Sequence, residues 1–145
     1  MSDYSDYIEH MSNVSSGLYL LTGFTFTVIT FLLIGLKDVS STATQTTLFY
    51  LTILFYLFMF MIGWNSTRVL QLCSKIPKES KGVNLFNISL YLVYILFPLS
   101  LTFLFHQWNL TYLVLGSLSI WATYSILVWF FIMKPLRKWR NELAS

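Results

Sequence analysis

The stretch LTFLFHQWNLTYLVLG, residues 101–116, decides the fold because it interrupts a long apolar region that runs from Val83 to Met133. As a single helix with a rise of about 1.5 Å per residue, that region would measure roughly 76 Å. The hydrocarbon core of a bilayer is only about 30 Å thick, so the chain must reverse. The polar cluster His-Gln-Trp-Asn, residues 106–109, is the place for a tight turn at the membrane surface, because a helical hairpin needs only a few loop residues. In this interpretation Asn109 is the N-cap of the following helix.

Composition extends the membrane assignment to the whole chain. Hydrophobic residues make up 56% and charged residues 10%, whereas about 25% of the residues in soluble domains are charged. The charges are gathered between four uncharged tracts, each near the length of about 20 residues that a membrane-crossing helix needs. We therefore predict an all-α integral membrane protein. It is an up-down bundle of four transmembrane helices, with spans at about residues 17–36, 46–67, 83–105 and 110–133.

The distribution of basic residues predicts the orientation. Four spans place both termini and the loop after the second span on one side, and this side collects eight of the nine Lys and Arg residues. The opposite side has only Lys37. Cytoplasmic segments are enriched in Lys and Arg, so we predict that both termini are cytoplasmic. The eight basic residues are Arg68, Lys75, Lys78, Lys81, Lys134, Arg137, Lys138 and Arg140.

The two ends of the chain have opposite charge. Residues 1–16 form an acidic segment with apolar residues at helical spacing, which predicts a short amphipathic helix that contacts the basic loop or a partner; a solvated tail is the alternative. Residues 134–145 form a basic segment, which predicts an interfacial helix at the anionic headgroups of the cytoplasmic leaflet. The residues expected at this interface are Arg137, Lys138, Trp139 and Arg140.

Small residues predict how the spans pack, because helices in lipid approach closely where side chains are small. The first span carries Gly23, Thr27 and Thr30 on one face. The fourth carries Gly116, Ser119 and Thr123 at similar spacing, so we expect these two spans to cross there.

The second and third spans have other features. The second is bulky throughout LFYLTILFYLFMFMI, residues 48–62, so we expect it at the edge of the bundle, where Phe55, Phe58 and Met59 would face lipid or a partner subunit. In the third span, Pro98 removes a backbone donor and is expected to kink the helix and free the carbonyl of Tyr94.

The predicted spans carry no Asp, Glu, Lys or Arg in their central parts, which argues against a proton-coupled exporter. His10 and His106 fall on opposite sides of the membrane, so they cannot ligate one haem, and Cys73 is likewise separated from His106. Asp6, Glu9 and His10 share a helix face, but three such residues near a terminus often occur by chance. We therefore predict no catalytic, cofactor or metal site. We also expect no nucleic-acid partner, because the basic residues lie close to the membrane.

These features favour a non-catalytic accessory or scaffold subunit of a larger membrane protein complex, whose partners are other integral membrane subunits. The alternative is a small oligomeric transporter or channel, with the Thr and Ser faces and Pro98 along its path. Co-purification with larger partners would favour the first function, and solute flux in liposomes would favour the second.

Overall fold

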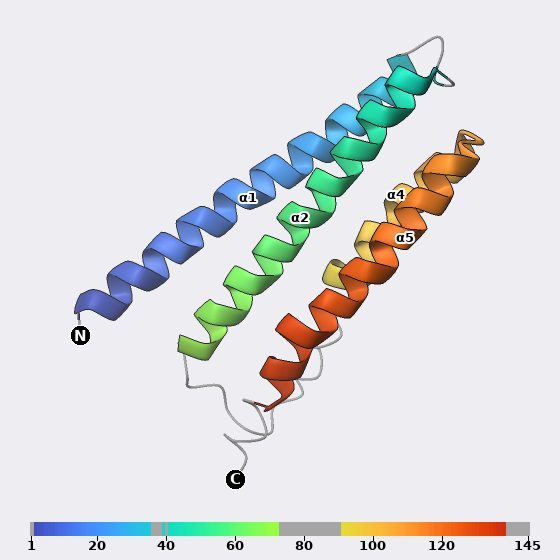
Figure 1. Ribbon diagram of the computed structural model, residues 1–145. Coiled ribbons are helices and arrows are strands. Elements are labelled where there is room, and N and C mark those ends of the chain that lie inside the picture. Colours follow the sequence, from blue (N-terminus) through green and yellow to red (C-terminus); the bar gives the residue numbers. More distant parts are fainter. Residues whose placement is uncertain (1, 36–38, 40, 73–90, 139–145) are drawn as a thin grey trace.

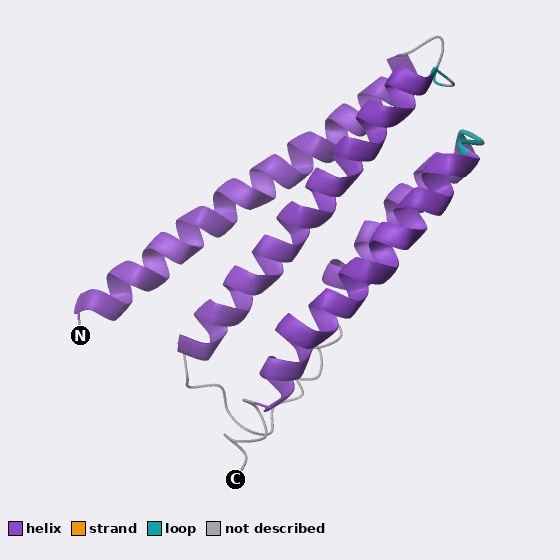
Figure 2. Cartoon of the chain, in the orientation of Figure 1, coloured by secondary structure: helices purple, strands orange, loops and turns teal. Residues whose placement is uncertain are grey.

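The computed structural model describes residues 2–35, 39, 41–72 and 91–138, and these residues form helices with no strand (Figure 2). Three helices are long and apolar enough to cross a membrane, as expected for a multi-pass membrane protein. They correspond to the first, second and fourth predicted spans. The third predicted span is described only as the shorter apolar helix Leu92–Gln107, and residues 83–90 lie outside the described residues. The elements are α1 (Ser2–Gly35), α2 (Thr42–Leu72), the π-helix η1 (Leu92–Leu96), α4 (Phe97–Gln107), α5 (Thr111–Val128) and the π-helix η2 (Trp129–Met133).

The helices alternate in direction. The end of α1, the start of α2 and the turn between α4 and α5 lie at one end of the molecule, and the start of α1 and the end of η2 lie at the other (Figure 1). As a consequence α2 and α5 run parallel to each other. At the start of α2, the Ser41 hydroxyl accepts a hydrogen bond from the backbone N–H of Thr44 at 3.3 Å, which caps the helix.

The turn after His106 confirms the predicted reversal but not the predicted role of Asn109. The Asn109 N–H bonds the carbonyl of His106 at 3.0 Å, and the Leu110 N–H bonds the carbonyl of Phe105 at 3.1 Å. This pair of bonds is a Schellman motif, which closes the end of α4. Asn109 has a φ of 55° and therefore takes the left-handed position after that helix, which Asn tolerates better than most residues. The N-cap of α5 is Leu110, and it makes no side-chain capping bond.

The predicted edge position of the second span is wrong, because α2 occupies the middle of the bundle. It packs against α1 on one side and against α4, α5 and the two π-helices on the other (Figure 1). Phe55 and Met59 are buried, and Phe58 is half-buried, so they form part of the core rather than a free partner surface. Glycines on α2 and on α5 allow these two helices to approach closely. A Cβ added at Gly63 would lie 2.8 Å from Ile132 Cδ1, and one added at Gly116 would lie 3.0 Å from Phe49 Cε2.

The predicted crossing of the first and fourth spans is also wrong. Among the described elements, the Cα atoms of α1 come within 8 Å of those of α2 only. Gly116 does serve close packing, but it packs against Phe49 of α2, which lies between the two helices that were expected to meet. Some side chains of α1 reach further than its backbone. The Phe26 ring, for example, lies 6.0 Å from that of Phe55 and 6.1 Å from that of Phe97.

Each of the two π-helices ends two residues before a proline. In η1 the Phe97 N–H bonds the carbonyl of Leu92, and in η2 the Lys134 N–H bonds the carbonyl of Trp129. Pro98 and Pro135 follow. Proline cannot donate a backbone hydrogen bond, and its ring clashes with the carbonyl four residues earlier in a regular helix. The wider turn accommodates the ring, so the chain continues as a helix past both prolines.

The two terminal segments extend the long helices. The described part of the acidic segment, residues 2–16, belongs to α1 itself, so it is not a separate helix. At the other end, the helix that begins at Thr111 continues to Lys138, where Arg137 and Lys138 are exposed. Trp139 and Arg140 lie outside the described residues.

Candidate functional site

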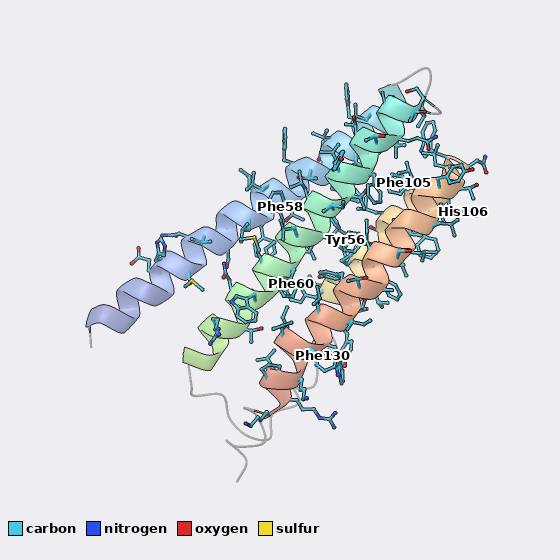
Figure 3. All side chains as sticks on the ribbon, viewed as in Figure 1. Tyr56, Phe58, Phe60, Phe105, His106 and Phe130 are labelled. Carbon is cyan, nitrogen blue, oxygen red and sulfur yellow. The ribbon has the colours of Figure 1, made fainter. Side chains whose placement is uncertain are left out.

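Tyr56 reaches from the middle of α2 into the space between α4 and α5 (Figure 3). Its hydroxyl donates a 2.9 Å hydrogen bond to the carbonyl of Pro98. Its ring packs edge-on against that of Tyr124 of α5, with ring centroids 5.1 Å apart. The two tyrosines are 3% and 4% exposed, so this contact is the centre of the interface between three helices.

Two more hydrogen bonds join the α4 side of the bundle to α5. The hydroxyls of Thr102 and Ser117 lie 3.0 Å apart and are both buried. One turn further along α5, the Trp121 indole N–H donates to the carbonyl of Ile95 at 2.8 Å. Hydrogen bonds of this kind hold membrane helices together where apolar side chains gain little by leaving lipid.

A second polar group lies where α1, α2 and η1 meet. The Tyr94 hydroxyl is 3.4 Å from the hydroxyl of Tyr19 and 3.3 Å from that of Ser66. The three residues come from three different elements, so this group complements the contact made by Phe26. It is the point at which α1 is tied by hydrogen bonds to the rest of the described bundle.

Three buried hydroxyls have no hydrogen-bond partner among the described residues. They belong to Ser100 of α4 and to Tyr124 and Ser125 of α5. Buried polar groups are usually paired with protein or with ordered water. These hydroxyls are therefore the positions in the interior where water or a small polar solute would find a partner.

The small residues predicted to pack lie in different surroundings. Gly23 and Thr27 are exposed on α1, and Ser119 and Thr123 are exposed on α5, while Thr30 is half-buried. The four hydroxyl groups bond carbonyls of their own helices four residues earlier, at 2.9 to 3.1 Å. These hydroxyls therefore bond within their own helices and do not join α1 to α5.

The histidines are not brought together. His106 is exposed in the last turn of α4, beside the turn (Figure 3), and His10 is exposed near the start of α1, at the other end of the molecule. Within the described ranges, no three His, Cys, Asp or Glu residues are placed to hold a metal ion. Cys73 lies outside the described residues, and the side chain of Asp6 is not described.

An open apolar groove of about 400 Å³ lies between α2 and the helix formed by α5 and η2. Aromatic rings form much of its wall. The Trp64 ring lies 6.4 Å from that of Phe60 and 6.0 Å from that of Phe131. This groove was not predictable from the sequence, because its two walls lie more than sixty residues apart in the chain. The lining residues are Phe60, Met61, Trp64, Asn65, Leu127 and Phe131.

No protein-family model, no curated protein and no solved structure matches this chain. What the protein does must therefore follow from its own surfaces and buried groups.

Proposed function

We propose that this protein is a four-span, non-catalytic subunit of a larger membrane protein complex, with both termini in the cytoplasm. The free face of α1 is the surface that binds a transmembrane helix of the partner. The observation that carries this proposal is the position of α1, whose backbone approaches α2 and no other described element.

The free face of α1 suits a close helix–helix contact. Nothing lies within 4 Å of a Cβ added at Gly23, and Thr27, one turn further on, is exposed. Large apolar side chains flank these small residues, with Leu20 76% and Phe24 67% exposed. A small centre with a bulky apolar rim lets a partner backbone approach closely and gives it side chains to pack against.

The interior supports a packing role. Tyr56, Thr102, Ser117 and Trp121 all use their polar atoms to join helices within the bundle. These bonds hold the bundle as a unit that can present one outer face to a partner. They would also keep the internal interfaces in place when the partner binds.

Four spans are supported by the directions of the helices. Helix α4, part of the shorter apolar helix Leu92–Gln107, runs opposite to both α2 and α5, as a third span would (Figure 1). The cytoplasmic placement of the termini rests on the excess of Lys and Arg on that side of the predicted topology.

Co-purification from native membranes tests the proposal. The tagged protein, extracted in a mild detergent, should retain a larger membrane protein in fixed ratio, measured by quantitative mass spectrometry. We expect Thr27→Leu to lower the retained partner about tenfold, because the larger side chain blocks close approach and a tenfold change needs only about 1.4 kcal/mol. The matched control is Thr123→Leu on α5, because Thr123 is also exposed and its hydroxyl also bonds its own helix.

The proposal predicts that the control variant retains the partner at the wild-type level. Recovery of this chain alone from native membranes would contradict it. So would an equal loss of partner in both variants, because that result would show no special role for α1.

A second candidate function is a small oligomeric transporter or channel. The buried hydroxyls of Ser100, Tyr124 and Ser125 favour it, because they find no hydrogen-bond partner in the described part of the chain. A polar solute or a line of water molecules could bond these groups inside the bundle. Purified protein in liposomes would then move a solute, and Tyr124→Phe would reduce the flux. Absence of flux for ions and small polar solutes would leave the subunit function as the better proposal.

A further inference from the structure

We propose that the groove between α2 and α5 binds one acyl chain of an anionic phospholipid, whose phosphate is held by Arg68 and Lys134. The site differs from the surface assigned to the partner, since it lies on the side of α2 that faces α5.

The shape and lining of the groove suit a lipid chain. Phe60 and Trp64 are one turn apart on α2, and Leu127 and Phe131 are one turn apart on the parallel helix, so the groove runs along the helix axes. Its volume of about 400 Å³ falls within the range of about 300 to 1,000 Å³ that is typical of ligand pockets. A chain lying along the helices would replace open space by contacts with three aromatic rings.

Two cations lie beyond the same end of the groove. Arg68 follows Trp64 by one turn, and its guanidinium carbon lies 4.9 Å from the centroid of the Trp64 ring. Lys134 follows Phe131, and its ammonium nitrogen lies 5.6 Å from the centroid of the Phe130 ring. Stacking fixes the guanidinium while its edge remains able to bond a phosphate. Because α2 and α5 run in the same direction, both cations are at the same end.

Asn65 supplies a polar group between the apolar wall and the charged end. It lines the groove and is half-buried, and its side chain makes no hydrogen bond with the described residues. Its amide can donate to an ester carbonyl, the group that joins the acyl chain to the headgroup region of a phospholipid. The order along the groove, apolar then amide then cation, matches the order of groups in the lipid.

This charge pattern favours a lipid over a partner helix as the occupant. A helix about 10 to 12 Å in diameter would have to bring an acidic side chain to the level of Arg68 and Lys134. An anionic phospholipid carries its chain and its phosphate in one molecule, and the cations lie at the membrane-surface end of the two spans. The leaflet that supplies it is the one at the end of α2.

Lipid retention in the full-length protein tests the site. The protein is placed in nanodiscs with equal amounts of phosphatidylglycerol and phosphatidylcholine of the same chain length, and the lipids that remain after detergent release are counted by native mass spectrometry. A basic residue near the surface contributes about fivefold to the preference for anionic lipid. We therefore expect an enrichment of about 25-fold for phosphatidylglycerol, which Arg68→Gln together with Lys134→Gln should abolish.

Two further variants separate this site from general attraction to a basic surface. Arg137→Gln removes a nearby exposed charge that does not adjoin the groove, so it should lower the enrichment less than either Arg68→Gln or Lys134→Gln does. Leu127→Trp fills the groove and should lower the retention of both lipids, with circular dichroism confirming the helical fold. Equal retention of the two lipids by the wild-type protein would overturn the proposal. Enrichment that survives the double variant would overturn it as well, and so would wild-type retention of lipid by Leu127→Trp.

Discussion

At the level of single residues, Tyr56 shows how polar atoms stabilise a bundle whose surroundings are as apolar as its core. Its hydroxyl bonds the carbonyl of Pro98 across the interface, while its ring packs on Tyr124. We expect Tyr56→Phe to keep the ring contact and lose only the hydrogen bond. The free energy of unfolding should fall by about 0.5–1.5 kcal/mol, measured by reversible denaturant unfolding in bicelles.

The control for this prediction is Tyr50→Phe, which makes the same change on the same helix. Tyr50 is 63% exposed, so its substitution should leave the unfolding free energy unchanged. An equal stability of Tyr56→Phe and the wild-type protein would show that the bond to Pro98 contributes nothing.

Two glycines give opposite predictions for the same substitution. A Cβ at Gly63 would lie 2.8 Å from Ile132, whereas a Cβ at Gly23 would meet nothing within 4 Å. Gly63→Leu should therefore force α2 away from η2 and cost about 1–3 kcal/mol through overpacking. Gly23→Leu should be neutral or slightly stabilising, because leucine favours the helix over glycine. The free energies of unfolding of the two variants are to be measured in the same bicelles. Equal values would contradict this prediction.

At the level of the elements, the turn between α4 and α5 depends on the left-handed conformation of Asn109. Asn109→Gly should keep the wild-type stability, because glycine adopts positive φ without strain. Asn109→Val should lower the free energy of unfolding by about 1–2 kcal/mol, the cost of this conformation for a residue with a Cβ. Thermal unfolding of both variants would show the difference, and two identical melting curves would rule out this role for Asn109.

The location of this turn could be predicted from the sequence, but its geometry could not. A helix of roughly 76 Å does not fit a bilayer, so the chain had to reverse, and the polar cluster at residues 106–109 gave the place. Asn is favoured both as an N-cap and at the left-handed position after a helix, and the residue type does not distinguish the two. The bond from Leu110 to Phe105 distinguishes them, and it depends on backbone geometry.

The central place of α2 was not predictable from hydrophobicity. In lipid both the inner and the outer face of a helix are apolar, so the pattern of apolar residues does not show which face is buried. The bulk of residues 48–62 suggested an edge helix, yet Phe55 and Met59 are core residues, and the Phe55 ring packs near those of Phe26 and Phe97. Gly63, directly after that stretch, and Gly116 on α5 are the positions that allow the close approach.

The buried polar contacts were out of reach for a similar reason. The bond from Trp121 to the carbonyl of Ile95 joins residues of two helices whose relative rotation no sequence pattern fixed. Pro98 does lie close to an irregular turn of its helix, since η1 ends two residues before it. The carbonyl of Pro98 accepts its hydrogen bond from the hydroxyl of Tyr56, on a different helix.

At the scale of the whole molecule, the alternating helices bring the start of α2 and the α4–α5 turn to one end and the start of α1 and the last described turn to the other (Figure 1). The orientation of this arrangement in the membrane is the broadest prediction. Cys73 is the only cysteine, so Cys73→Ser gives a background in which single new cysteines can be placed. Gln107→Cys lies at the α4–α5 turn and Arg137→Cys at the opposite end, and both positions are exposed.

A maleimide that cannot cross the membrane should label Gln107→Cys in intact cells, and it should label Arg137→Cys only after mild detergent opens them. The physical reason is that eight of the nine basic residues fall on the side of residue 137 in the predicted topology, and such a bias favours a cytoplasmic location for that side. Replacing one arginine leaves seven basic residues against one, so the substitution itself should not invert the protein.

Thr42→Cys, at the start of α2, should behave like Gln107→Cys because both lie at the same end of the bundle. Labelling of Arg137→Cys in intact cells would show that the orientation is the opposite of the predicted one. Different behaviour of Thr42→Cys and Gln107→Cys would contradict the up-down arrangement itself.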